Sequence, residues 1–491
     1  MSEVSVRGLA LGVLLAGFEG DRELPSWLEE LLPEGLAGVT LFGRNIVDDD
    51  PIGHLQGLTG RLRADRPDLL IAIDEEGGDV TRLETRSGSM TLGAATLGAI
   101  DDVAVTRRSS ALLADRLLAG GINLNFAPVG DLLSERDNPV VGARSFSRHA
   151  EVAARHVAAS VRGHLDRGIA PTVKHFPGHG ATVDDSHLVV PVVTVDAGTL
   201  RRRELQPFEA AIAAGVPVVM TGHLRVLAFD PDRPATLSPT IITDLLRGDL
   251  GYSGVVVTDG MDMYAISRSV GRPEGTVQAL LAGVDLICIG GESVTREAVE
   301  EIVDAVEAAV AAGRLPLARL VEAQGRVAAL ADRFRAGNGA SSSAPVTDPV
   351  LTAAARRSLR VVGDPRVEQV ANVIELYNEP TVVAGEVAFG VGRHVAELLA
   401  GPVAVWRVEE GAELPPLAAG ELVVSVRASH LHPWQAETVR QLRLRRPDLI
   451  VVDHGATAGR DLLGERAVQA FDTSAIAGRA AAELILGRDH R

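Results

Sequence analysis

Residues 172–187 read TVKHFPGHGATVDDSH, and this stretch decides how the rest of the chain is interpreted. It opens as a short apolar run typical of a buried parallel strand, and polar side chains follow from Lys174 onward. Lys174 is the only lysine, because the other 47 of the 48 basic residues are arginines. A compact ammonium on a flexible stem differs chemically from a planar guanidinium. The stretch therefore predicts a strand that ends in a functional site.

The same pattern recurs along the first two thirds of the chain. Apolar runs alternate with stretches rich in Ala, Leu, Arg and Glu, which predict helices such as 103–119 and 151–167. This rhythm favours a TIM-like (β/α)8 barrel over residues 1–335, with a doubly wound open sheet as the alternative. The predicted strands are 38–42, 69–73, 124–128, 172–175, 217–220, 255–258 and 286–289. In a barrel, the polar residues that follow them would meet at one rim, where active sites form.

A second, smaller domain is predicted after a linker. Residues 336–350 begin with a run of small, polar and breaker residues that is typical of a linker. Residues 351–491 then show another strand–helix rhythm, which predicts an α/β sandwich that ends in an Ala-rich helix near 475–486. Its predicted strands are 381–383, 403–406, 422–425 and 449–452. Residues 385–392 lack the spacing of a dinucleotide-binding loop.

Composition excludes several classes of function. The net charge of −17 disfavours a nucleic-acid or anionic membrane surface. Cys288 is the single cysteine, so no intrachain disulfide is expected. Residues 8–15 are apolar but lack the basic flank and cleavage site of a signal peptide, and no run is long enough to span a bilayer. We expect a cytoplasmic protein, and the sequence leaves its oligomeric state open.

Asp259 follows the apolar run 255–258 directly. A carboxylate at this point of a barrel suits a nucleophile or an electrostatic stabiliser, and the simpler alternative is a helix N-cap. Asp262, three residues later, is expected to be an ordinary acid at a helix start.

Asp185 and His187 are two residues apart in a stretch flanked by glycines and a proline. Such a pair can fix the tautomer of the ring and raise its basicity, so that His187 could give and take a proton. A mobile lid is one reading of this loop, and a plain surface pair is the other. A third interpretation is a metal site built from His175, His179, His187 and Asp185, but the spacing of these residues matches no strong ligand pattern. We expect no metal and no cofactor.

These motifs together resemble glycoside hydrolase family 3, and more narrowly its β-N-acetylglucosaminidase branch. The resemblance covers nearly all of residues 1–335, in order, and extends more weakly to the second domain. It rests on KHFPGHG at 174–180, DSH at 185–187, TDGMDM at 258–263, IDEEGG at 73–78 with Arg82, APV at 127–129, GARSF at 142–146, residues 38–45 and MTGH at 220–223.

The resemblance implies a retaining exo-β-N-acetylglucosaminidase that acts on small carbohydrates such as cell-wall or chitin fragments. It implies that Asp259 is the nucleophile and that His187 is the general acid/base, paired with Asp185. The residues that it implies for sugar binding are Asp74, Arg82, Arg144, Lys174 and His175, with His223 lining the same subsite. In this branch a loop histidine replaces a glutamate of the second domain, so Glu409 and Glu410 would act only if the assignment of His187 is wrong.

Some alternatives stay open at this point. A neutral histidine tolerates an incoming phosphate better than a carboxylate does, so a phosphorylase is compatible with the motifs. A β-glucosidase is compatible too, and a sugar-binding protein without turnover is the alternative from another class. Two departures from the family pattern, Glu75 where many relatives have Gln and Gly260 after the nucleophile, bear on fine specificity.

Overall fold

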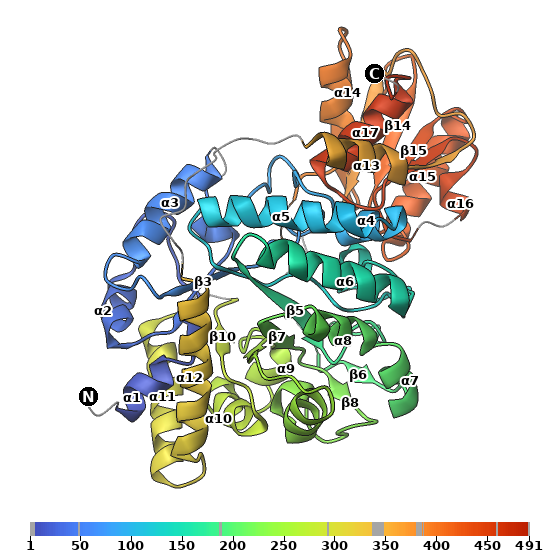
Figure 1. The fold of residues 1–491 in the computed structure, drawn as a ribbon. Coiled ribbons are helices and arrows are strands. Elements are labelled where there is room, and N and C mark those ends of the chain that lie inside the picture. Colours follow the sequence, from blue (N-terminus) through green and yellow to red (C-terminus); the bar gives the residue numbers. More distant parts are fainter. Residues whose placement is uncertain are drawn as a thin grey trace.

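The computed structural model describes residues 5–47, 50–185, 189–291, 294–335, 348–379, 385, 387–457 and 460–489. Within them, eight parallel strands form the first sheet (Figure 1). They are β1 Leu14–Ala16, β2 Gly38–Leu41, β3 Leu70–Ile73, β4 Leu124–Asn125, β5 Ala170–Phe176, β7 Val218–Thr221, β9 Val255–Thr258 and β10 Ile287–Ile289. Their order is β10-β1-β2-β3-β4-β5-β7-β9, and a parallel bridge from Val257 to Leu286 joins β9 to the chain just before β10. The ring is therefore nearly closed, and the predicted barrel is confirmed.

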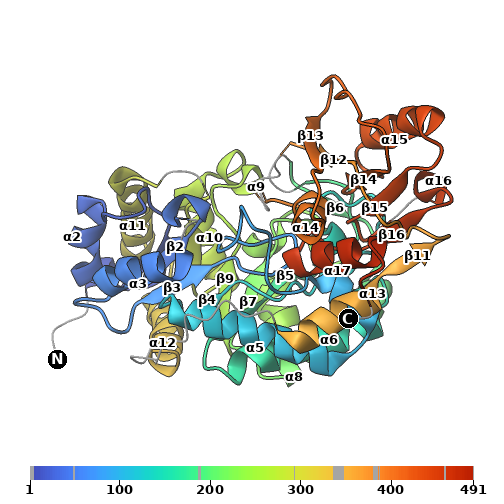
Figure 2. The same cartoon turned by 90° about the horizontal axis from the view of Figure 1, so that it is seen from above.

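Helices surround this barrel and bury its outer face (Figure 2). Between β7 and β9 lies a π-helix at Thr240–Asp249, and the strands β6 Val192–Val193 and β8 Arg225–Val226 form a small separate sheet. The α-helices are α1 Val6–Leu11, α2 Ser26–Glu34, α3 Pro51–Leu62, α4 Ala94–Ile100, α5 Val103–Ala119, α6 Ala150–Leu165, α7 Ala197–Arg202, α8 Gln206–Ala213, α9 Tyr264–Ser267, α10 Arg272–Ala282, α11 Arg296–Ala311 and α12 Leu317–Arg333.

The inside of the barrel is filled from its amino-terminal end. Residues near the starts of the strands, such as Leu70 and Val255, form one buried cluster with Val327 and Leu330 of α12 and with Phe334. This apolar plug closes that end of the barrel. A polar cavity can therefore form only at the opposite end, where the strands finish.

The barrel was predicted accurately except at its beginning. All seven predicted strands correspond to strands of the first sheet, and the predicted helix 103–119 is α5. No strand was predicted before residue 38, whereas the chain forms α1, turns at Gly12 and then enters β1. Three residues are too few for a strand to show a pattern of its own.

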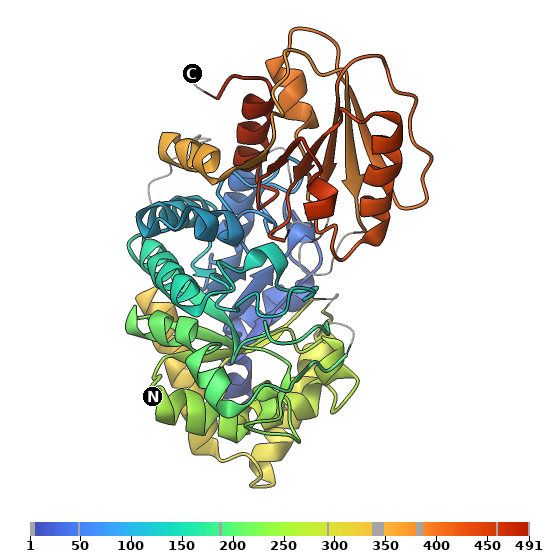
Figure 3. The same ribbon diagram turned by 90° about the vertical axis from the view of Figure 1, so that its right-hand side faces the viewer.

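The second domain is a sandwich with helices on both faces of a six-stranded sheet (Figure 3). Its strands are β11 Arg360–Val362, β12 Asn372–Tyr377, β13 Ala404–Glu409, β14 Leu422–Val426, β15 Ile450–Asp453 and β16 Ala467–Gln469, in the order β11-β16-β15-β14-β12-β13. Only β11 runs antiparallel to its neighbour. The helices α14 Gly392–Leu398 and α17 Ala475–Ile485 cover one face, and α15 Pro433–Arg445 and α16 Arg460–Leu463 cover the other. The predicted sandwich is confirmed.

Three of its strands, β11, β12 and β16, were not predicted, and β12 lies next to the edge strand β13. Asn372 and Glu375 interrupt the apolar run of β12, and both use their side chains locally: Asn372 bonds the backbone of Ala418, and Glu375 accepts from the Gly392 amide. Residues 381–383, predicted as a strand, lie outside the described residues.

The second domain contacts the loop of the barrel that follows β3. Asp79 of this loop accepts hydrogen bonds from the amide and hydroxyl of Thr473, at 2.9 and 3.0 Å, and pairs with Arg427 at 3.0 Å. The helix α13 Pro349–Ser358 packs against α4 and α5 of the barrel. None of the helices in the described ranges is long and apolar enough to cross a membrane. The domain boundaries at residues 335 and 350 stay a prediction.

Candidate active site

A cavity of about 650 Å³ lies at the carboxyl-terminal end of the barrel. Strand ends and the loops that follow them supply its walls, because parallel strands of a barrel all finish at the same rim. Thr40, Phe126, Met220 and Cys288 form part of its lining. Six residues implied by the resemblance also line it, namely Asp74, Arg82, Arg144, Lys174, His175 and Asp259. The fold therefore gathers into one cavity side chains that are far apart in the sequence.

Asp259 lies at the end of β9, on the wall of this cavity. Its amide donates to the Thr221 carbonyl at 3.2 Å, and its Oδ1 accepts from the Gly260 amide at 2.8 Å. The N-cap of the next helix, α9, is Met263, so the N-cap alternative for Asp259 is wrong. Asp262 does not start a helix either, because its carboxylate accepts from the Gly290 amide and pairs with Arg272. Asp259 is thus a carboxylate presented to the cavity.

A cluster of buried charges lies beside it. The Lys174 ammonium is 2.5 Å from Asp74 and 2.7 Å from Glu76, and Arg144 forms a two-point pair with Glu76 at 2.7 and 2.9 Å. Lys174 is only 1% exposed, which is tolerated because both of its carboxylate partners are in contact. Such a cluster presents fixed, charge-assisted hydrogen-bonding groups to a polyhydroxylated ligand.

The pKa values in this cluster follow from the pairing. Burial alone would raise the pKa of Glu76, but Arg144 and Lys174 outweigh it and hold that pKa well below its ordinary value. Burial alone would lower the pKa of Lys174, and Asp74 and Glu76 reverse the direction of that shift. Both shifts favour the ionised forms of Glu76 and Lys174 at neutral pH.

His175 is oriented by a buried carboxylate. Its Nδ1 donates to Asp131 at 2.7 Å, and Asp131 also accepts from the backbone amide of His179 at the same distance. This hydrogen bond fixes the orientation of the His175 ring, and His175 lines the cavity.

His223 is fully buried and is not part of the cavity lining. Its Nε2 donates to the Gly260 carbonyl at 2.9 Å, and its Nδ1 lies 2.8 Å from the Thr236 hydroxyl. Gly260 is the residue whose amide donates to Asp259. The geometry therefore gives His223 a supporting position behind Asp259, rather than the place on the cavity wall that the resemblance implied.

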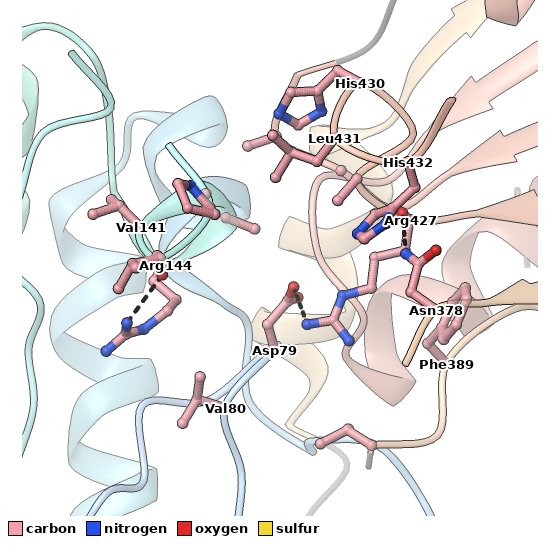
Figure 4. A pocket seen from close by; sticks show the side chains of 18 of the residues that line it. Asp79, Val80, Val141, Arg144, Asn378, Phe389, Arg427, His430, Leu431 and His432 are labelled. Carbon is pink, nitrogen blue, oxygen red and sulfur yellow. Dashed lines mark hydrogen bonds and ion pairs between the residues drawn. The ribbon is translucent and has the colours of Figure 1, made fainter. Parts of the chain in front are cut away.

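A second, smaller cavity lies between the barrel and the second domain (Figure 4). Asp185 is among the residues that line it. This interdomain cavity, of about 120 Å³, shares Val140 and Arg144 with the main cavity, so the two adjoin. His187, the implied acid/base, lies outside the described residues. The structure thus places the implied partner of His187 beside the main cavity, on the side of the second domain.

Two buried carboxylates of the site were missed by the sequence reading. Glu76 lies between Lys174 and Arg144, and Asp131 holds His175 and His179. Both follow predicted strands, which was the available signal, but sequence alone does not show which acid of such a stretch meets which base. Within the described ranges, no group of three or more His, Cys, Asp or Glu side chains could hold a metal ion.

Glu75 is a buried carboxylate whose pKa is set mainly by burial. It is fully buried, its Oε2 accepts from the Arg82 and Leu83 amides, and its Oε1 has no hydrogen-bond partner among the described residues. Burial, with a smaller contribution from Glu84, raises its pKa from 4.5 to about 7.

We therefore expect Glu75→Gln to stabilise the fold in alkaline solution. The pKa of Glu75 is higher in the folded than in the unfolded protein. The stability that protonated Glu75 contributes to the wild-type fold is therefore fully present below about pH 4.5 and is lost as the pH rises through about 7. Gln keeps the acceptor without the charge, so the free energy of unfolding at pH 8 should rise by about 2–3 kcal/mol. Urea unfolding at pH 5 and pH 8 measures this, and an equal effect at both pH values would contradict it.

Comparison with known proteins identifies the family. Residues 14–330 match the model of the glycosyl hydrolase family 3 N-terminal domain. The chain belongs to glycosyl hydrolase family 3, and the resemblance inferred from the sequence is confirmed.

Individual relatives agree with this. A protein named beta-hexosaminidase from Stenotrophomonas maltophilia (strain K279a) is 37% identical over 301 residues, which are 60% of this chain and 86% of that protein. Beta-hexosaminidase A from Pseudoalteromonas piscicida is 36% identical over 284 residues, but the match spans only 47% of its length and 54% of this chain. A solved family 3 beta-N-acetylglucosaminidase from Paenibacillus sp. str. FPU-7 has a TM-score of 0.87 and 31% identity, covering 99% of this chain and 97% of its own.

Proposed function

We propose that this protein is a retaining exo-β-N-acetylglucosaminidase that releases terminal β-linked N-acetylglucosamine from small carbohydrates. The observation that carries the proposal is the position of Asp259 on the wall of the same cavity as the cluster of Lys174, Asp74, Glu76 and Arg144. The names of the relatives support the choice of substrate.

The proposed mechanism has two displacements. Asp259 attacks the anomeric carbon while the bond to the leaving oxygen breaks and His187 gives that oxygen a proton. Water then attacks the glycosyl-enzyme, His187 takes its proton, and Asp259 is released. Asp74, Arg82, Lys174 and His175 would hold the sugar hydroxyls in the oxocarbenium-like transition state.

The second domain has a supporting role in this proposal. Its contacts to Asp79 brace the loop after β3, which carries Asp74, Glu76 and Arg82. The second domain would therefore hold the sugar-binding residues in place without supplying the general acid.

A cytoplasmic location also stays a prediction, which cell fractionation would check.

One assay tests the function directly. We expect nitrophenol release from the β-N-acetylglucosaminide to exceed release from the β-glucoside, at a rate independent of added phosphate, with free N-acetylglucosamine as the sugar product. A sugar 1-phosphate would instead identify a phosphorylase, and preference for the glucoside would overturn the choice of sugar. Tight binding of the sugar without turnover would favour a binding protein.

A further inference from the structure

The interdomain cavity lies between loops of the barrel and of the second domain (Figure 4). It adjoins the main cavity at Val140 and Arg144, and Asp185 is in its lining. In the proposed function, the proton reaches the leaving oxygen from His187, two residues after Asp185. The part of the substrate beyond that oxygen is therefore directed into this cavity, and the inference below rests on the proposed function.

The charges of this cavity are balanced. Arg144 pairs with Glu76 at 2.7 Å, and Arg427 pairs with Asp79 at 3.0 Å. The third arginine of the described lining, Arg407, pairs with Glu409 at 2.9 Å. Asp185 and Glu379 add further negative charge to the same lining. An acidic leaving group would thus meet no cation without a carboxylate partner among the described lining residues.

Two histidines, His430 and His432, are also part of the polar lining, together with Tyr377, Asn378 and Thr457, and both histidines are neutral at pH 7. Burial first, and then the positive charge of a neighbouring arginine, lower the pKa of His430 and of His432. The His430 Nε2 donates to the Arg136 carbonyl at 3.1 Å. The side chain of His432, which lies beside Arg427 in Figure 4, makes no hydrogen bond to any described residue. A neutral imidazole offers one donor and one acceptor, which is what a hydroxyl-bearing ring can use.

The size of the cavity limits what it can hold. Its volume of about 120 Å³ is well below the roughly 300–1,000 Å³ typical of pockets for drug-sized ligands. We propose that the leaving group of the natural substrate is a single uncharged sugar unit, and that His432 hydrogen-bonds one of its hydroxyls. The substrate is then a neutral disaccharide or the end of a neutral oligosaccharide, and acidic amino sugars are poor leaving groups here.

The test compares three substrates with the full chain. They are the nitrophenyl β-N-acetylglucosaminide, N,N′-diacetylchitobiose, and N-acetylglucosamine β-linked to N-acetylmuramic acid, whose lactyl group carries a carboxylate. We expect kcat/KM for diacetylchitobiose to exceed that for the acidic disaccharide at least tenfold. Equal or faster turnover of the acidic disaccharide would overturn the inference. No sugar release from any of the three would overturn the proposed function itself, and the inference with it.

Variants at His432 locate the contact. His432→Leu should lower the ratio of diacetylchitobiose to nitrophenyl kcat/KM about tenfold, the scale of one lost hydrogen bond, and His432→Gln should restore part of it. His432→Arg adds an unbalanced cation and should narrow the gap between the neutral and the acidic disaccharide.

The matched control is His149→Leu, because His149 and His432 are both helix N-caps whose side chains make no capping hydrogen bond. The control should leave the substrate ratio at the wild-type value, and thermal unfolding should show that all variants fold. A ratio unchanged in His432→Leu, or changed equally in His149→Leu, would refute the role of His432.

Discussion

Replacing Asp259 by Ala is expected to lower kcat by roughly 10⁴-fold or more, because the reaction loses the nucleophile that divides it into two steps. The loss should be similar for good and poor leaving groups, since neither can be displaced without an attacking carboxylate. Stopped-flow release of nitrophenol and product analysis measure it. Added azide should not restore a product of retained configuration, because azide can attack only the face that Asp259 occupied.

His187→Ala is the comparison that separates the two roles. Loss of the acid should slow poor leaving groups more than activated aryl glycosides, because only poor leaving groups need protonation. A fluorinated glycosyl fluoride, which slows the second step, should label the wild-type protein at Asp259. Labelling of another carboxylate, such as Asp262, or an Asp259→Ala enzyme with near wild-type turnover, would refute the assignment of the nucleophile.

Glu76→Gln is expected to damage both stability and activity. It would leave Lys174 and Arg144, which are 1% and 8% exposed, facing each other without the carboxylate between them. Removing one partner of a buried ion pair costs about 3–5 kcal/mol of unfolding free energy. We also expect kcat/KM to fall about 100-fold or more, because Arg144 loses its paired carboxylate and Lys174 keeps only Asp74 as a partner. Urea unfolding and steady-state kinetics at pH 7 measure the two effects.

Glu274→Gln is the matched control for that variant. Glu274 pairs with Arg314 on the surface, where both side chains are more than 40% exposed, so its loss should cost less than about 1 kcal/mol. The effect of Glu76→Gln should also depend on pH. The pKa of Glu76 is lowered in the fold, so its contribution is present above the unfolded pKa and fades as pH falls through the folded one. Wild-type stability of Glu76→Gln at pH 7 would contradict this prediction, because it would show that the negative charge of Glu76 does not stabilise the fold.

The sequence was most informative where strands end. Two strands, 255–258 and 172–175, were both predicted. Asp259 follows the first directly, and Lys174 and His175 lie near the carboxyl end of β5, so both strands deliver polar residues to the rim of the barrel. This works because a buried parallel strand is mostly a continuous apolar run, so charged residues near its carboxyl end stand out in the sequence. The short strand β1 and the polar strand β12 gave no such signal.

Contacts across the sequence could not be predicted in the same way. Glu76 stood next to Glu75 in one acidic pair, yet one is ion-paired and the other is buried without a cation. His223 matched a family motif, but its ring faces Thr236 and Gly260 instead of the cavity. Which way a side chain turns depends on neighbours supplied by other strands.

The sequence by itself determined the barrel, the family and the identity of the residues at its rim, because local apolar patterns and short motifs are properties of contiguous residues. Only the tertiary structure decided that Glu76 holds Lys174 and Arg144, that Asp79 ties the loop after β3 to the second domain, and that two cavities adjoin at Arg144. Those features depend on distances between residues up to about 400 positions apart, and such distances are fixed only when the two cores pack together.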